Sequence, residues 1–276
     1  MPNTHHDQAA GLRRIMTGHQ PKIVSVLSAA DHQPRLMTNL AASISKQDCD
    51  VLVLHTAQTA SMDKSLYGIK SLPTLAGVAH KQLDLAQSVK EAKFGFLVAK
   101  LFASQPQYLK STNTGTDIEL NKTFEKLASL FEVILVDATL DKGNQLPLPM
   151  LNQHEIIIQL TCDAVSIKQA YTMIKQIYSN IGRRSFGIIV SDASDKQAAK
   201  AFRNIAQVAK SHLQIELEFF GAIPNDEHLG RAAKLGRAII DAFPLTNAAK
   251  AINSLAQRLN YKHHTNTSEP ELVSLI

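Results

Sequence analysis

The sequence predicts a three-layer α/β protein of the Rossmann type, with a mainly parallel, twisted sheet covered by helices on both faces. From Lys22 onward, short apolar runs alternate with amphipathic helices, which is typical of repeated βαβ units. Several of these runs lack the alternation of a half-buried strand, as expected when helices cover both faces of a sheet. The 276 residues, 45% of them hydrophobic, are enough for one full core.

Seven strands are expected in chain order. They are residues 23–27, 51–55, 94–99, 132–137, 155–160, 186–191 and 215–223. Between them, apolar residues recur every three or four positions, which indicates helices with one core-facing stripe. The clearest stripe consists of Ile167, Ala170, Tyr171, Ile174, Ile177, Tyr178 and Ile181. A last helix follows Pro244, and its stripe consists of Leu245, Ala248, Ala249, Ile252, Leu255 and Leu259.

The chain is expected to divide into an arm, one domain and a tail. Residues 1–21 form an N-terminal arm, in which Leu12 and Ile15 lie three positions apart in a segment too short for a stable isolated helix. Residues 22–260 are expected to form a single α/β domain. Residues 261–276 are expected to be a flexible tail without a strong membrane anchor, because their short apolar end is flanked by acidic residues.

Composition narrows the class of protein. The formal net charge of +5 allows an acidic partner, but the basic residues are scattered and no Trp is present, so a solvated surface is favoured over a nucleic-acid site. Two cysteines, with Cys162 expected to be buried, fit a reducing compartment. The absence of a signal-peptide pattern favours the cytoplasm. The histidine pairs lack spaced partner ligands, so no metal site is expected.

The stretch from the first strand to the following helix is where an α/β fold would carry a phosphate-binding loop. Such a loop needs glycines, a lysine and a Ser or Thr for Mg²⁺. Here the chain has no glycine between Gly18 and Gly68. The turn and the start of the helix read Ser28, Ala29, Ala30, Asp31, His32, Gln33, Pro34 and Arg35. The side chain of Asp31 or Gln33 is expected to cap the helix in place of a phosphate.

Several segments together resemble the MinD/ParA group of deviant Walker ATPases, which have a P-loop NTPase-like fold. Residues 132–138 resemble the Walker B strand with its terminal aspartate, Asp137. Residues 159–177 and 219–224 resemble the family's later strands, the second of which lies near the nucleotide base. The arm is similar to the motif that regulators of flagellar number and placement (FlhG/FleN type) use to act on a signal-recognition-type GTPase. The matching arm residues are Asp7, Gln8, Ala9, Gly11, Leu12 and Arg13, followed by Arg14.

The sequence departs from this family at the residues that bind and hydrolyse the nucleotide. Both loop lysines are missing, and the family's DAD-like acidic turn is replaced by His55, Thr56 and Ala57. Asp63 and Asp137 are the vestiges of the catalytic set, so no ATP hydrolysis and no cofactor are expected. For Asp137, two roles are considered: an indirect contact to Mg²⁺ through one of its ligands, and a structural hydrogen bond to the turn that follows the strand.

The leading hypothesis is a non-catalytic regulator of flagellar biosynthesis or placement. It would bind the flagellar GTPase or another regulator through its arm, and any dimer would have to form without nucleotide. One alternative is a weak ATP-binding protein or ATPase that uses Mg²⁺, Arg35, Asp137 and Asp63. The other alternative, suggested by the basic pI of 9.1, is a transcriptional cofactor.

Overall fold

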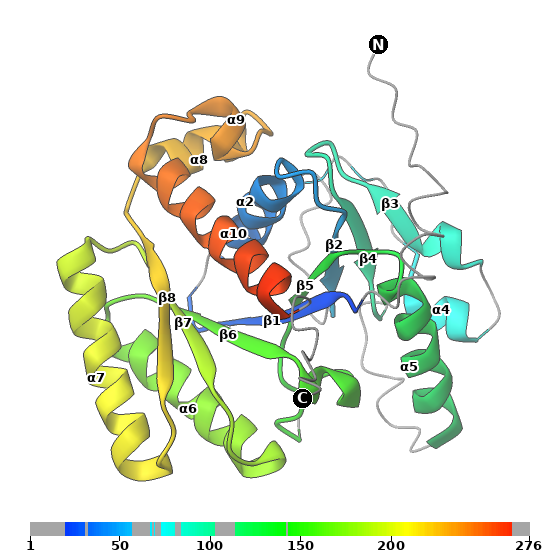
Figure 1. Ribbon diagram of the computed structural model, residues 1–276, viewed down its shortest axis with the longest axis horizontal. Coiled ribbons are helices and arrows are strands. Elements are labelled where there is room, and N and C mark those ends of the chain that lie inside the picture. The colour runs from blue at the N-terminus through cyan, green and yellow to red at the C-terminus, as the bar shows by residue number, and fades with distance from the viewer. Residues whose placement is uncertain are drawn as a thin grey trace, which may run out of the picture.

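The computed structural model describes residues 20–30, 33–56, 67, 69, 73–80, 84–102, 114–141 and 143–266, and it confirms the predicted three-layer α/β fold (Figure 1). The strands are β1 (Lys22–Ser28), β2 (Val51–His55), β3 (Val89–Glu91), β4 (Leu97–Lys100), β5 (Val133–Asp137), β6 (Glu155–Leu160), β7 (Phe186–Ser191) and β8 (Leu217–Ile223). They form one sheet in the order β3-β4-β2-β5-β1-β6-β7-β8. All neighbours are parallel except β3 and β4.

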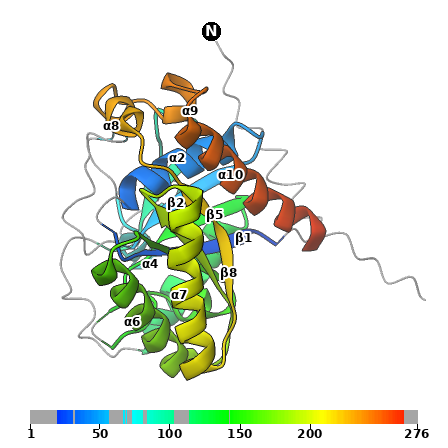
Figure 2. The same ribbon diagram turned by 90° about the vertical axis from the view of Figure 1, so that its left-hand side faces the viewer.

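Helices cover both faces of this sheet, as Figures 1 and 2 show. One face packs against α4 (Leu75–Ala79), α5 (Thr114–Ala128), α6 (Ala164–Ile181) and α7 (Asp195–Leu213). The other packs against α2 (Gln33–Ser45), α8 (Glu227–Lys234), α9 (Ile239–Ala242) and α10 (Asn247–Asn266). In the part of the chain that the structure describes, the short 3₁₀ helices η1 (Leu85–Ser88) and η3 (Pro149–Gln153) lie in the connections. Among the residues described, no helix has the length and apolar character needed to cross a bilayer.

The predicted stripe of α6 is confirmed, because its members are buried in the core or packed against it. In the last helix, the prediction for Leu245 is wrong: its exposed fraction is 83%. The helix begins at Asn247, and Ala249 N donates to Thr246 Oγ1 at 3.3 Å, which makes Thr246 the N-cap. Leu245 therefore precedes the helix and faces away from the core.

Two strands begin more than one residue away from the predicted position. The strand expected at residue 94 begins at Leu97, because the preceding residues form the turn of a β3–β4 hairpin. Ala92 N donates to Phe96 O at 2.9 Å, and Gly95 has the positive φ of 88° that glycine tolerates best. The last strand begins at Leu217 rather than at Ile215, although Ile215 is buried.

The predicted burial of Cys162 is also wrong, because this thiol is only partly buried. Cys162 lies just beyond β6 and next to Asp163, the N-cap of α6, where the chain leaves the sheet. Its partial burial, and then the neighbouring carboxylate of Asp163, raise the pKa of the Cys162 thiol.

Candidate functional site

The candidate site lies where neighbouring parallel strands end at the same edge of the sheet. β2 ends at His55 and β5 ends at Asp137, and these two residues are register partners. His55 Nδ1 lies 2.6 Å from Asp137 Oδ2. Ligands of open α/β sheets bind at this carboxyl edge. The acid predicted as a catalytic vestige is therefore at the expected edge, and a histidine side chain is bonded to it.

A chain of hydrogen bonds extends from this pair into α2. His55 Nε2 lies 3.0 Å from the hydroxyl of Tyr67, and Thr38 Oγ1 donates to that hydroxyl at 3.5 Å. A neutral imidazole protonated on Nδ1 satisfies both contacts, since it donates to Asp137 and accepts from Tyr67. His55, Tyr67 and Thr38 are all buried. The chain therefore connects the ends of β2 and β5 with α2 through side chains alone.

The turn after β2 is also fixed to the end of β5. Thr56 N and Thr56 Oγ1 both donate to the carbonyl of Asp137, at 3.1 and 2.9 Å. Thr56 is buried. Thr56 thus replaces part of an acidic turn with two neutral hydrogen bonds, and it holds the backbone next to the His55–Asp137 pair.

This arrangement is unsuited to Mg²⁺. Mg²⁺ requires oxygen ligands in a near-octahedral arrangement, whereas the imidazole of His55 bonds the Asp137 carboxylate. Within the described residues, no group of three or more His, Cys, Asp or Glu side chains is placed to hold a metal ion. A cation bound through Asp137 Oδ2 would have to displace His55. Asp63 lies outside the described residues.

Tyr67 makes the buried network sensitive to alkali. Burial, and to a lesser degree the Asp137 carboxylate, raise the pKa of Tyr67 well above its ordinary value of 10.0, against the opposing effect of the Thr38 hydrogen bond. The unfolded chain loses this proton first. The resulting stability is therefore complete below the ordinary tyrosine pKa and is lost as the pH rises toward the folded value.

We expect the free energy of unfolding to fall with rising pH above pH about 10, and Tyr67→Phe to remove part of that fall. Urea unfolding at a series of pH values, followed by far-ultraviolet circular dichroism, measures both slopes. An identical slope in the two proteins would contradict the prediction.

The first backbone N–H groups of the turn after β1 donate to acceptors within the protein. Ala29 N donates to Gln159 O at 2.8 Å, and Ala30 N donates to Ser28 Oγ at 3.0 Å. Ser166 Oγ of α6 donates to Ala29 O at 2.8 Å. A phosphate loop presents such N–H groups to the ligand. The first two donors of this turn have protein acceptors instead.

The remainder of the predicted loop is only partly described. Asp31 and His32, and the side chains of Gln33 and Pro34, lie outside the described residues. The expected cap by Asp31 or Gln33 therefore stays a prediction. Arg35 is exposed near the start of α2 and lines a cavity of about 330 Å³.

This cavity lies at the ends of β6, β7 and β8, next to the segment that resembles the family's base-binding loop. Its polar lining includes Gln159, Ser191, Asp192, Asn225, Asp226 and Glu227. Among its described lining residues, Arg35 is the one cation, against three carboxylates. The cavity is thus large enough for a small ligand, but its net charge disfavours a triphosphate.

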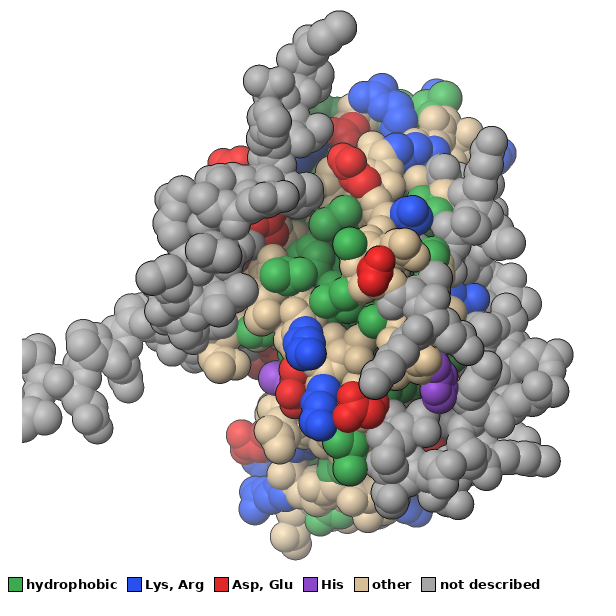
Figure 3. Space-filling model, turned by 90° about the vertical axis from the view of Figure 1, so that its right-hand side faces the viewer, with side chains coloured by type: hydrophobic (Ala, Val, Ile, Leu, Met, Phe, Trp, Pro, Cys, Tyr) green, Lys and Arg blue, Asp and Glu red, His purple; other side chains and the backbone are tan. Residues whose placement is uncertain are grey.

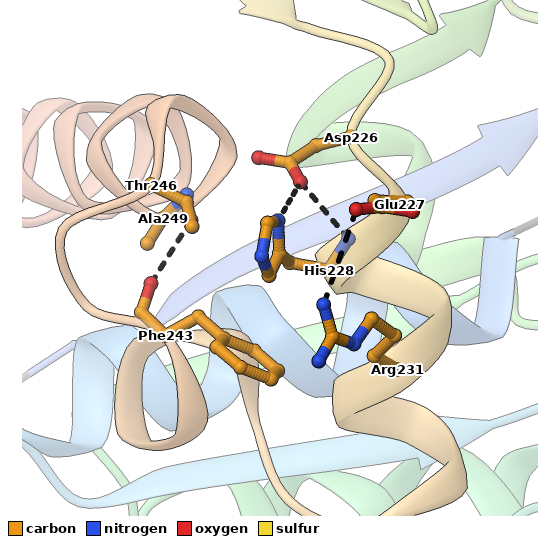
Figure 4. A network of polar contacts seen from close by, with 7 residues as sticks. All are labelled: Asp226, Glu227, His228, Arg231, Phe243, Thr246 and Ala249. Atoms are coloured by element: carbon orange, nitrogen blue, oxygen red, sulfur yellow. Dashed lines mark hydrogen bonds and ion pairs between the residues drawn. The ribbon is translucent and has the colours of Figure 1, made fainter.

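Asp226 already has a structural role on the wall of this cavity (Figure 4). It accepts from His228 N at 2.9 Å as the N-cap of α8, and His228 Nδ1 lies 2.7 Å from the same oxygen. Burial raises the pKa of Asp226, but these bonds outweigh burial and lower it overall. The His228 ring packs edge-to-face on Phe243, with 4.7 Å between centroids, and Arg231 lies over the same ring.

Asn39 connects α2 to the C-terminal helices. Its Oδ1 accepts from Ile239 N at 2.7 Å, and its Nδ2 donates to Arg35 O at 2.7 Å. Asn39 is buried, and its bond to Ile239 spans 200 positions of sequence. Asn39 therefore fixes the packing of α2 on α9.

We expect Asn39→Ala to lower the free energy of unfolding by about 2 kcal/mol, because the buried N–H of Ile239 would lose its acceptor. Asn180→Ala is the matched control, since exposed Asn180 donates to Asn144 O at 2.7 Å. Urea unfolding measures both changes. Equal losses in the two variants would contradict the prediction.

The fold and this edge site define a P-loop NTPase-like α/β protein, and comparison with known proteins specifies the type. MinD from Pyrococcus horikoshii, solved with Mg-ADP, has a TM-score of 0.67 at 15% identity, covering 91% of this chain and all of that one. MinD from Aquifex aeolicus has a TM-score of 0.65 at 17% identity, covering 90% and 98%. These structures support the fold.

Comparison of sequences then indicates which subgroup of these proteins the chain resembles. The antiactivator FleN of Pseudomonas aeruginosa is 23% identical over 252 residues, 90% of each chain. An uncharacterized ATP-binding protein of Methanocaldococcus jannaschii is 22% identical over 81% of each chain. No model of a known protein family matches the sequence. The predicted resemblance to the MinD/ParA type, and within it to the FlhG/FleN regulators, is confirmed.

Sequence reasoning located Asp137 and the turn after β1 but missed the partners that engage them. It treated His55 only as the residue that replaces an acidic turn, and it assigned no role to Tyr67 or to Gln159. The sequence did contain a signal for the contact between His55 and Asp137, since each of these residues ends a predicted strand. Residues 1–19 of the arm lie outside the described residues, so the partner-binding role of the arm stays a prediction.

Proposed function

We propose that this chain is a non-catalytic, MinD-like regulator in the control of flagellar number or placement. It binds a protein partner through its N-terminal arm and works without ATP. The sequence similarity to FleN supports the flagellar context. The MinC:MinD complex of Aquifex aeolicus, a solved structure with the same fold, supports a protein as the kind of partner.

The observation that carries the non-catalytic part is the bond between His55 and Asp137. Mg²⁺-dependent phosphoryl transfer depends on carboxylates that hold the cation and on cations that neutralise the phosphates. Here the Asp137 carboxylate bonds an imidazole 2.6 Å away, and the first two N–H groups of the turn after β1 donate within the protein. In the described part of the chain, groups from both halves of a nucleotide site are thus engaged by the protein itself.

We expect isothermal titration with ATP and Mg²⁺ to give no binding tighter than roughly millimolar. Each lost charge-assisted hydrogen bond to phosphate removes roughly 1.5 to 3 kcal/mol, so the loss of three weakens binding by about a thousandfold or more. Adenosine serves as the control ligand, because it tests the cavity without the phosphates. Micromolar binding of ATP that requires Mg²⁺ would contradict the proposal.

The cavity beside Arg35 favours a second candidate, a weak ATP-binding protein. On that reading, Arg35 contacts the phosphates and the segment around Asn225 contacts the base. The titration with ATP and Mg²⁺ separates the two candidate functions. Repeating it with Arg35→Ala tests whether Arg35 contributes to ATP binding. A loss of ATP affinity in this variant, with adenosine binding unchanged, would favour the second candidate.

The protein partner can be identified by comparing the full chain with a form that lacks the arm. Pull-down by the full chain and by a form lacking residues 1–21 should differ in one protein partner, with a flagellar signal-recognition-type GTPase as the first candidate. The FleN relative is named an antiactivator, so a transcription regulator is the second candidate. Retention of every partner by the truncated form would remove the proposed role of the arm.

A further inference from the structure

An apolar groove lies at the end of the sheet opposite the His55–Asp137 pair. Its volume is about 440 Å³. Its apolar lining includes Leu85, Val89, Leu97, Leu127, Leu130 and Phe131. These residues come from η1, β3, β4 and the end of α5, so the groove lies near the amino ends of the parallel strands. Figure 3 shows hydrophobic side chains gathered on this side of the molecule, with charged groups around them.

The groove is apolar inside and acidic at one end. Leu130 keeps 41% of its surface exposed, and it lies beside other apolar side chains of the groove rather than singly on the surface. Asp50 lines the groove, and Glu132 Oε2 accepts from Asp50 N at 3.0 Å. Burial raises the pKa of the Cys49 thiol, and the charges of Glu132, Asp50 and Asp48 raise it further against the opposing hydrogen bond of Asn260. A ligand that combines apolar and basic side chains fits this surface.

The N-terminal arm leaves the domain beside this groove. Lys22 N, at the start of β1, donates to Glu132 O at 2.8 Å, and Glu132 follows the groove residue Phe131. Ile15 lies seven positions before Lys22, and an extended chain of that length spans at most about 25 Å. The arm is thus tethered at the acidic end of the groove with enough length to reach it.

The arm carries side chains that match both parts of the surface. Leu12 and Ile15 lie three positions apart and would project from one face of a helical turn. Arg13 and Arg14 lie between them in the sequence. We propose that the arm occupies this groove of its own domain, with Leu12 and Ile15 against the apolar lining and the arginines toward Asp50 and Glu132.

With this intramolecular docking, the arm has two states: one bound in the groove and one released from it. A partner that captures Leu12 and Arg13 has to displace the arm from the groove, so docking lowers the apparent affinity for that partner. Only this consequence rests on the proposed function. The docking itself is a property of the free chain and is tested without any partner.

The test uses the absence of tryptophan from the chain. Leu12→Trp places a single reporter in the arm of the full-length protein. Docking predicts an emission maximum at shorter wavelength than in the isolated arm peptide, and acrylamide quenching reduced severalfold. Adding Leu130→Glu should return both values to those of the peptide. Leu245→Glu is the matched control, because Leu245 is an exposed leucine outside the groove and should change neither value.

A second pair of substitutions keeps the test independent of damage to the domain. Arg13→Glu with Arg14→Glu, in the same reporter chain, leaves the groove intact and should also return the emission to the peptide value. Peptide-like emission in the unmodified reporter chain would overturn the proposal. Protected emission that survives Leu130→Glu would overturn it too, because the arm would then dock elsewhere. Sedimentation that shows a dimer lost with Leu130→Glu, while the reporter stays exposed, would assign the groove to a second copy instead.

Discussion

Replacing His55 with alanine should lower the free energy of unfolding by about 3 kcal/mol, because it removes one partner of a buried pair and leaves the other uncompensated. The side chains of His55 and Asp137 are 4% and 13% exposed, so water has little access to the orphaned carboxylate. The variant also removes one of the two partners of the Tyr67 hydroxyl and leaves Thr38 as the other. Urea unfolding measures the change.

A second His–Asp pair in the same chain provides the control. His228 and Asp226 make a contact of 2.7 Å, but their side chains are 31% and 13% exposed, and Asp226 keeps its backbone bond to α8 without the imidazole. His228→Ala should therefore lower the free energy of unfolding by about 1 kcal/mol or less. If the two alanine variants lose equal stability, the His55 pair is not the buried bond described above.

Replacing His55 with aspartate should have the larger effect, and that effect should depend on metal. The new carboxylate would lie against Asp137, and two carboxylates at such a distance strongly disfavour joint ionisation. In the presence of a chelator, the variant should lose more stability than His55→Ala and regain part of it at acidic pH, where one carboxyl binds a proton.

Mg²⁺ should then restore stability to His55→Asp but leave the natural chain unchanged. A cation that binds only the folded state stabilises it by about 2.7 kcal/mol at a concentration of 100 times its dissociation constant. Thermal unfolding with increasing Mg²⁺ measures this, and His228→Asp, in a cap rather than between strands, is the control. A variant that ignores Mg²⁺ would show that removing the imidazole is not enough to expose a cation site at Asp137.

The fold was largely predictable because its signals are local. Buried strands and amphipathic helices can be recognised from apolar spacing, and the α6 stripe was predicted from that spacing. β3 was missed because its sequence, Val89–Glu91, has three residues, two of them charged, and only its pairing with β4 makes it a strand. Leu245 was misplaced because its spacing fits the helix, whereas the Thr246 cap decides where the helix begins.

The site was less predictable because its contacts are long-range. Asp137 could be located as the acid at the end of a buried strand. Its bond to His55 spans 82 positions and depends on β2 lying next to β5, an order that no local pattern encodes. The same holds for Asn39, whose partner Ile239 becomes a neighbour only when α2 packs on α9.

Both edges of the sheet limit growth by strand addition. At one edge, β3 offers only three residues, and Lys90 and Glu91 are exposed. At the other, Arg258 of α10 donates to the carbonyls of Phe219 and Phe220 in β8, at 2.6 and 2.8 Å, and lies over the Phe220 ring. Long, unprotected edge strands are templates for aggregation. A chain that loses α10 would lose this cover of β8, and strand addition at the exposed edge would then favour fibrous association.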